Sequence, residues 1–382
     1  MKVLILSCNT GGGHNACAKA ICDSFAEKGI SCTSVDALAF ISGRTSSVMS
    51  NGHTWIYRHC PRLFSMGYAR ADKKRSSFSE GSAAYKFFAK STPELYKFIV
   101  RGGYDVVICA HVFTALMLTD VLKKHKLSIL SAFFATDYTF SPSGDQSDLD
   151  LYFIPGTALV SEFEGYGIDG KKIRVSGIPT RSEFATRREM ADAKKAFGIH
   201  ENHAHIVVMS GSMGCGPIKK LTKLLSASLS HKQEVTVVCG TNKSLFAELS
   251  DMYENDPRIH IKGYVKDVSL LLDSADLYLT KPGGISVTEA AVKGLPMVLL
   301  NAVAGCEEYN MNFFLERGCA MTGKDIKEIA EAAVSLLSDR EKLSKMSKAL
   351  NNLNYAGAAN NIRDDIIKCK GEMDSYERLH TV

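Results

Sequence analysis

The chain has 382 residues, of which 45% are hydrophobic and 23% are charged. This length exceeds the size at which a single hydrophobic core keeps growing, so two domains of about 150 to 200 residues are expected. The composition is close to that of average soluble proteins and excludes a largely disordered chain.

The eleven cysteines are odd in number, scattered along the chain and never spaced as Cys-x-x-Cys, which favours buried free thiols over a disulfide scaffold. The apolar run at residues 2–7 is too short for a signal peptide and is predicted to be a first strand. The longest apolar region, residues 106–118, contains His111 and falls short of the roughly 18 residues of a membrane span. We therefore expect a cytoplasmic protein.

Apolar runs flanked by glycine alternate with helical patterns from end to end, which is typical of parallel sheets covered by helices. The predicted fold class is α/β. One series of strands is predicted near residues 2–7, 105–110, 129–135, 149–154 and 173–175. A second series is predicted near residues 205–210, 235–239, 259–261, 277–280 and 297–300.

Each series opens with a strand, a glycine-rich turn and a helix, at residues 3–14 and again at residues 206–216. This pseudo-repeat predicts two Rossmann-like domains, residues 1–178 and 179–382, facing one another across a cleft. Active sites of such sheets lie at the carboxyl ends of the strands.

The first glycine motif with specific chemistry runs from Lys281 to Glu289 and reads Lys-Pro-Gly-Gly-Ile-Ser-Val-Thr-Glu. Paired glycines let a pyrophosphate approach the backbone, and the amino end of the following helix offers free N–H groups. Glu289 is then placed to accept the two hydroxyls of a ribose. The alternative is a plain turn between a strand and a helix, with a glutamate favoured by the helix dipole.

The second glycine motif is Gly11-Gly12-Gly13-His14, which lacks both the dinucleotide fingerprint and the Gly-Lys-Ser/Thr of a phosphate loop. A helix amino end disfavours the imidazolium, so His14 is a candidate neutral proton acceptor. A purely structural histidine is the alternative.

The third glycine motif, residues 209–216, is the equivalent turn of the second half. Four of its residues are candidate phosphate or donor ligands: Gly211, Ser212, Met213 and Gly214. An Asp-x-Asp sequence at Asp148 and Asp150 raises the possibility of a metal-dependent transferase, but it lies at the start of a predicted strand. The histidines also lack ligand spacing, so no metal and no other cofactor is expected.

An insertion at about residues 41–97 is basic and aromatic. From Arg44 to Arg101 there are eleven Lys and Arg residues against three acidic ones, and ten of the chain's aromatic residues. Solvated helix faces, nucleic-acid binding and contact with an anionic membrane surface each fit this composition. The candidate membrane contacts are Trp55, Arg58, Arg62, Phe64, Lys73, Lys74 and Arg75.

In order along the chain, these motifs resemble glycosyltransferase family 28, and within it the monogalactosyldiacylglycerol synthases and processive diacylglycerol glucosyltransferases. The motifs that carry the resemblance are residues 11–14, 136–138, 175–179, 238–243, 263–265, 281–289 and 305–312. The resemblance implies a GT-B fold, with the acceptor on the first domain and the donor on the second. It also implies a last helix at about residues 358–370 that packs back on the first domain.

For the UDP-sugar, the resemblance implies that the backbone near Val265 holds the base and that Glu289 holds the ribose. Gly283, Gly284 and Ser286 would hold the diphosphate, with Gly240 and Asn242 beside them. Glu307 and Asn310 complete the donor site.

For the acceptor, the resemblance implies binding at Gly12, Gly13 and His14, with His14 as the base and Asp137 as an alternative base or orienting group. The implied reaction is an inverting single displacement without a metal.

The chain departs from the family pattern at Ala304-Gly305-Cys306-Glu307, where relatives carry Pro-Gly-Gln-Glu, and at residues 141–144, which lack the usual aromatic.

The leading hypothesis is transfer of glucose or galactose from UDP-glucose or UDP-galactose to diacylglycerol, by a protein bound peripherally to an anionic membrane and not to nucleic acid. Two alternatives remain. One is another UDP-sugar enzyme of this architecture, such as a lipid-linked N-acetylglucosaminyltransferase or an epimerase. The other is a non-catalytic nucleotide-sugar-binding protein.

Overall fold

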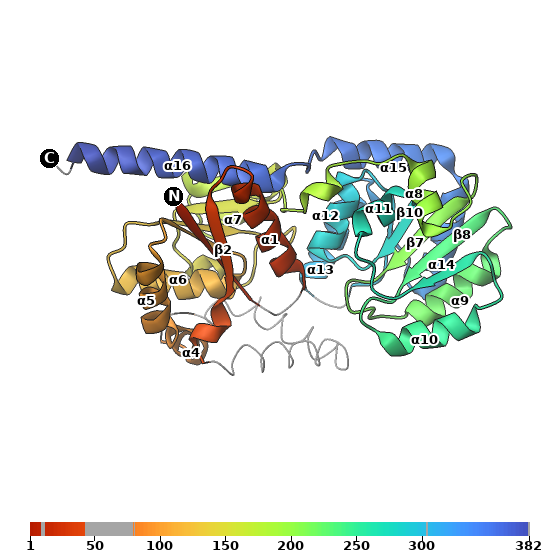
Figure 1. Ribbon diagram of the computed structural model, residues 1–382, viewed down its shortest axis with the longest axis horizontal. Coiled ribbons are helices and arrows are strands. Elements are labelled where there is room, and N and C mark those ends of the chain that lie inside the picture. The colour runs from red at the N-terminus through yellow and green to blue at the C-terminus, as the bar shows by residue number, and fades with distance from the viewer. Residues whose placement is uncertain (9–11, 43–78, 80, 303–304, 381–382) are drawn as a thin grey trace. The chain divides into compact units, whose positions relative to one another are not determined.

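The computed structural model describes residues 1–8, 12–42, 79, 81–302 and 305–380 (Figure 1). The chain forms two compact units. The first comprises Met1–Arg181, Ala304–Cys306 and Gly357–Val382, and the second comprises Ser182–Val303 and Glu307–Ala356. The chain thus enters the second unit at Ser182, three residues later than the boundary expected from the sequence.

The first unit is built on a sheet of six parallel strands in the order β2-β1-β3-β4-β5-β6. The strands are β1 (Lys2–Ser7), β2 (Ser31–Asp36), β3 (Val106–Cys109), β4 (Leu130–Phe134), β5 (Leu151–Ile154) and β6 (Ile173–Val175). The central strands β3, β4 and β5 are buried along their whole length, as expected for a sheet covered on both faces.

The sequence analysis missed β2, which lies at an edge of this sheet. Its residues, Ser-Cys-Thr-Ser-Val-Asp, are exposed or half-buried and contain a single large aliphatic side chain. An edge strand gains its place by hydrogen bonding along one side, so it does not need the apolar run that marks an interior strand.

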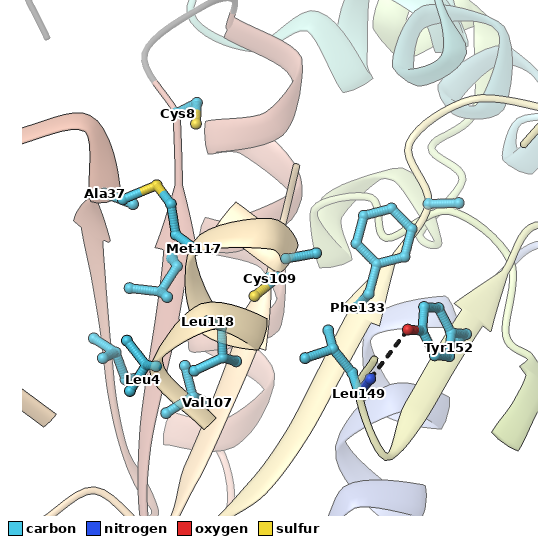
Figure 2. Packing of buried hydrophobic residues seen from close by; sticks show 14 of the residues in the cluster. Leu4, Cys8, Ala37, Val107, Cys109, Met117, Leu118, Phe133, Leu149 and Tyr152 are labelled. Atoms are coloured by element: carbon cyan, nitrogen blue, oxygen red, sulfur yellow. Dashed lines mark hydrogen bonds between the residues drawn. The ribbon is translucent and has the colours of Figure 1, made fainter. Parts of the chain in front are cut away.

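Helices cover this sheet and link its strands. They are α1 (Gly12–Ala26), α4 (Ala83–Ala89), α5 (Thr92–Gly102), α6 (Val112–Lys124), α7 (Val160–Gly165) and α16 (Ala358–His380), with short 3₁₀ turns η1 (Ala37–Phe40), η3 (Gly144–Gln146), η4 (Thr157–Leu159) and η5 (Gly170–Lys172). Figure 2 shows part of the core, where Leu4, Val107, Met117, Leu118 and Phe133 pack together.

One wall of that core carries a satisfied polar group. The hydroxyl of Tyr152 accepts a hydrogen bond from the backbone N–H of Leu149 at 3.1 Å and donates to the carbonyl of Ser147 at 2.9 Å (Figure 2). Burial raises the pKa of Tyr152 to about 12, so its proton stays in place and the loop before β5 remains fixed to the sheet.

A buried carboxylate fixes the two helices at the end of the insertion. Asp120 of α6 is 2% exposed and accepts hydrogen bonds from the hydroxyls of Tyr85 and Thr92, on α4 and at the start of α5. Lys124 forms an ion pair with the same carboxylate at 2.7 Å. The candidate membrane residues between Trp55 and Arg75 lie outside the described residues, so membrane contact by this segment stays a prediction.

The second unit repeats the architecture with six parallel strands in the order β12-β11-β10-β7-β8-β9. These strands are β7 (Ala204–Met209), β8 (Gln233–Val238), β9 (Ile259–Lys262), β10 (Leu277–Thr280), β11 (Met297–Leu299) and β12 (Ala320–Met321). The two-residue edge strand β12 is too short to give a sequence pattern, and the sequence analysis missed it as well.

The helices of this unit are η6 (Ser182–Phe184), α8 (Met190–Phe197), α9 (Ile218–Ser228), α10 (Lys243–Met252), α11 (Val268–Asp273), α12 (Gly284–Val292), α13 (Cys306–Glu316), α14 (Ile326–Ser338) and α15 (Arg340–Asn352). Two buried ion pairs brace it, Lys194 with Asp276 at 3.2 Å and Lys293 with Asp273 at 2.8 Å. Lys293 also caps the end of α12, where a cation is favoured by the helix dipole.

The last helix, α16, packs along α1 in the first unit (Figure 1). Its buried Arg363 donates to the carbonyl of Ser24 at 3.2 Å, and Asn360 accepts a hydrogen bond from the Ser24 hydroxyl at 2.8 Å. The chain therefore returns to its first unit after completing the second.

Within the described residues, all ten cysteines are free thiols. No described helix combines the length and the apolar character that crossing a membrane requires.

Candidate active site

In the first unit, His14 lies where three strands of the sheet end. Helix α1 begins at Gly12, shortly after β1, so the half-buried imidazole of His14 sits in its first turn. The Nδ1 atom is 2.9 Å from the carbonyl oxygen of Ala110, which follows β3, and 3.2 Å from Oγ1 of Thr136, which follows β4. Gly12 is exposed and Gly13 is half-buried beside it.

These contacts determine which nitrogen of His14 can act as a base. A backbone carbonyl accepts hydrogen bonds and cannot donate them, so Nδ1 must carry a proton to bond Ala110. In the neutral ring the other nitrogen, Nε2, is then unprotonated and able to take a proton from an alcohol.

Asp137 lies next to this site. The hydroxyl of Thr136 donates to the Asp137 carboxylate at 3.4 Å, while Thr136 also contacts His14. Burial lowers the pKa of His14 below its ordinary value, and the negative charge of Asp137 and the bond to Ala110 partly oppose that effect.

These opposing effects predict a pH shift for Asp137→Asn. A base works when it is unprotonated, so activity falls as the pH drops through the pKa of His14. Removing the carboxylate removes a charge that favours the imidazolium, so the acid limb should move to lower pH, by up to about one unit. Profiles of kcat/KM against pH test this; an acid limb that moves upward would mean that Asp137 acts in another way.

In the second unit, two glycine turns lock together at the ends of β7 and β8. Gly214 and Gly240 both have a left-handed φ of +56°, and a Cβ on either would overlap the carbonyl oxygen of the other turn, that of Cys239 or Ser212. The N–H of Thr241 donates to the Ser212 carbonyl at 3.0 Å.

Asn242 completes this junction. Its amide Nδ2 donates to the Gly214 carbonyl at 3.2 Å, and its Oδ1 caps α10 by accepting the N–H of Leu245 at 3.1 Å. The N–H of Gly240 donates to the carbonyl of Gly263 at 3.2 Å, which places the segment leading to Val265 against the same turn.

We expect Gly214→Ala to destabilise the second unit by about 2 to 4 kcal/mol, because it combines left-handed strain with a backbone clash. Gly263→Ala is the matched control: its Cβ would lie 3.9 Å from Phe246, an ordinary contact. Denaturant titration of both variants gives the comparison. Equal stability of the two would show that the turns adapt without cost.

The Lys281 to Glu289 motif follows β10 and opens α12, as the sequence predicted. Gly283 is the N-cap of α12, and as a glycine it leaves the N–H groups of the first turn without a side-chain cap. Ser286 is half-buried within that turn, and Glu289 is buried one turn later. The helix thus presents an amino end suited to an anion.

Helix α13 holds this motif from the other side. The Lys281 ammonium forms an ion pair with Glu307 at 3.0 Å, and Glu307 is 6% exposed. Asn310, fully buried, donates to the Pro282 carbonyl at 3.0 Å. Glu307 and Asn310 were expected as donor ligands. In the structure they bind Lys281 and Pro282, the two residues that precede the glycine pair.

Lys281 is a functional candidate to which the sequence analysis gave no role. A Cβ on Gly211 would lie 3.2 Å from Lys281 Cε, and one on Gly283 would lie 3.7 Å from it, so the lysine stem lies between two glycine turns. The sequence did contain a signal for this role. Lys281 is a cation at the start of a glycine motif predicted to bind a diphosphate, in a chain predicted to use no metal to neutralise that charge.

Ser212 is exposed and Met213 is half-buried. Both lie between Gly211, which faces Lys281, and Gly214, which packs against the Gly240 turn. The carboxyl ends of β7, β8, β9 and β10 thus bring together the predicted donor residues of the second unit, which lie far apart in the sequence.

The Asp-x-Asp sequence has other partners. Asp150 precedes β5 and accepts hydrogen bonds from the N–H and hydroxyl of Ser131 at 2.8 and 2.6 Å, and Asp148 pairs with Lys172 at 2.7 Å. In the described ranges, no group of three or more His, Cys, Asp or Glu side chains is arranged to hold a metal ion.

Known proteins resemble this chain in sequence and in fold. The family described as monogalactosyldiacylglycerol (MGDG) synthase matches residues 14–180, and the family described as glycosyl transferases group 1 matches residues 214–352. Among solved structures, Acinetobacter baumannii MurG gives a TM-score of 0.62 at 13% identity, covering 96% of this chain and 99% of that one. An S. aureus MnaA–UDP structure gives 0.64 at 14% identity, covering 96% of each chain. The fold and the matched families define a glycosyltransferase of the GT-B class.

Sequence relatives narrow the class. A processive diacylglycerol beta-glucosyltransferase of Bacillus subtilis (strain 168) is 27% identical over 376 residues, covering 96% of this chain and 95% of that protein. Monogalactosyldiacylglycerol synthase 1, chloroplastic, of Arabidopsis thaliana is 27% identical over 351 residues, covering 86% of this chain and 63% of that protein. These matches confirm the chain as a relative of the monogalactosyldiacylglycerol synthases and processive diacylglycerol glucosyltransferases of glycosyltransferase family 28.

Proposed function

We propose that this protein transfers a hexose from a UDP-sugar to the free hydroxyl of diacylglycerol, producing a membrane glycolipid. The observation that carries the proposal is the similarity to a diacylglycerol glucosyltransferase along 96% of the chain. The two glycine-rich sites, one with a candidate base and one with a candidate anion site, support it.

In the proposed reaction, Nε2 of His14 takes the proton of the acceptor hydroxyl as its oxygen bonds to C1 of the sugar. The bond from C1 to the diphosphate oxygen breaks in the same displacement, and UDP leaves with the electron pair. This single displacement inverts the configuration at C1. The amino end of α12 and the ammonium of Lys281 stabilise the charge that develops on the diphosphate. The mechanism needs no metal.

The acyl chains of the acceptor remain in the bilayer in this proposal. An apolar pocket of the first unit, lined by Val112, Phe133 and Phe140 among others, lies near His111 and Asp137 in the chain. It has room for about one water molecule and could not take an acyl chain. In this proposal the protein acts at an anionic membrane surface, with the basic aromatic insertion as its docking segment, because that segment combines cationic and aromatic side chains.

The test is incubation of the purified protein with UDP-glucose, UDP-galactose or UDP-N-acetylglucosamine and vesicles that contain diacylglycerol and anionic lipid. We expect UDP release and glycolipid formation with a hexose donor, and vesicle binding that weakens as salt rises. UDP release with none of the donors would refute the proposal. Preference for the N-acetylated donor would point to the alternative UDP-sugar enzymes instead.

The non-catalytic alternative has its own outcome, motivated by Cys306 in place of the glutamine of relatives. It requires that the protein bind UDP but turn over no hexose donor, and that Cys306→Gln fail to restore turnover.

A further inference from the structure

His111 contacts the ring of His14 but belongs to none of the motifs that define the candidate site. It lies directly after Ala110, whose carbonyl binds His14, and it is the N-cap of α6. The two imidazole rings meet edge to face, with centroids 4.8 Å apart and an interplanar angle of 71°. The ring of His111 also packs on Phe113 at 4.6 Å.

The cap determines the tautomer of His111. Its Nδ1 accepts the backbone N–H of Phe113 at 3.1 Å, so Nδ1 carries no proton and the proton of the neutral ring is on Nε2. Forming the imidazolium would place a proton on Nδ1 and break the helix cap. In the tautomer that caps α6, the ring of His111 carries no charge beside the base.

We propose that His111 is a positioning residue, whose ring holds the imidazole of His14 with Nε2 available to the acceptor hydroxyl. The proposal rests on the proposed function, in which His14 is the base. His111 acts in two separable ways: its Nδ1 caps α6, and its ring forms one wall of the site around His14. Among the described residues, the Ala110 carbonyl, the Thr136 hydroxyl and the Asp137 carboxylate also face His14.

Two substitutions separate these roles. His111→Asn keeps a side-chain oxygen that can cap the helix but removes the ring. His111→Phe keeps a ring of similar shape but cannot cap. A merely structural residue would make Asn the harmless change and Phe the harmful one.

With His111→Asn, we expect water to reach the His14 ring, so its pKa rises toward the ordinary value of 6.5 while the melting temperature stays near that of the wild type. Because the base is then less well oriented, kcat should fall about 10- to 100-fold with little change in KM for the donor. With His111→Phe, we expect the His14 titration of the wild type, a retained kcat and a lower melting temperature.

The measurements are the Cε1 shift of His14 in NMR titrations of the full chain, assigned with His14→Gln, and kcat against pH. An Asn variant with the wild-type titration and kcat would overturn the proposal, as would a Phe variant that shifts the titration as far as Asn. The titration needs neither donor nor acceptor. If the wild type transfers no hexose, the proposed function fails while the contact between the two histidines is still tested.

Discussion

Replacing His14 with alanine is expected to reduce sugar transfer by about 100- to 10,000-fold, the usual contribution of a general base. Binding of UDP should be unchanged, because the predicted donor residues lie in the second unit. The reason is the tautomer: the bond to the Ala110 carbonyl leaves Nε2 as the only ring nitrogen able to take the acceptor's proton.

The measurements for His14→Ala are glycolipid formation under saturating donor and UDP affinity by calorimetry. His125→Ala is a matched control, because it also replaces a histidine of the first unit with alanine. His125 follows the carboxyl end of α6 and stacks on Tyr96. If His14→Ala retained full transfer, or lost UDP binding and transfer together, the assignment of His14 as the base would be wrong.

The second large effect is expected from Lys281→Met, which should weaken UDP binding about 10- to 100-fold, the range expected when one hydrogen bond between charged groups is lost. The stem of Lys281 lies between Gly211 and Gly283, at the amino end of α12, where the diphosphate is predicted to bind. Affinity for uridine, which has no phosphate, should change little. Calorimetry with uridine, UMP and UDP at one salt concentration gives this series.

A control is needed because Lys281→Met leaves the buried Glu307 carboxylate without its ion pair. The double variant Lys281→Met/Glu307→Gln removes that buried charge and should bind UDP as weakly as the single variant while regaining stability. Lys223→Met, an exposed lysine of α9, controls for net charge. Equal losses for uridine and UDP would show that Lys281 supports the fold rather than the diphosphate.

The interior of both sheets could be predicted from the sequence because interior strands of a parallel sheet are apolar along their whole length. The predicted strand near residues 277–280 coincides with β10, and the one near residues 105–110 contains β3. The edge strands β2 and β12 could not be predicted in this way, since exposed side chains and short length remove the pattern.

The glycine motifs were also visible in the sequence, because close backbone approach and left-handed φ angles restrict a position to glycine. What Gly214 and Gly240 approach was not visible. Each is packed against the carbonyl of the other turn, so these two glycines join the turns to each other.

The sequence by itself therefore determined the fold class, the two similar halves and the turns at which function is expected, since each depends on local patterns. Tertiary structure alone decided the contacts that give the candidate residues their chemistry. His14 meets Ala110 and His111 across about a hundred residues of chain, and Lys281 meets Glu307 across 26. Such pairs form only when strands of a sheet end side by side, and no local pattern records which ends become neighbours.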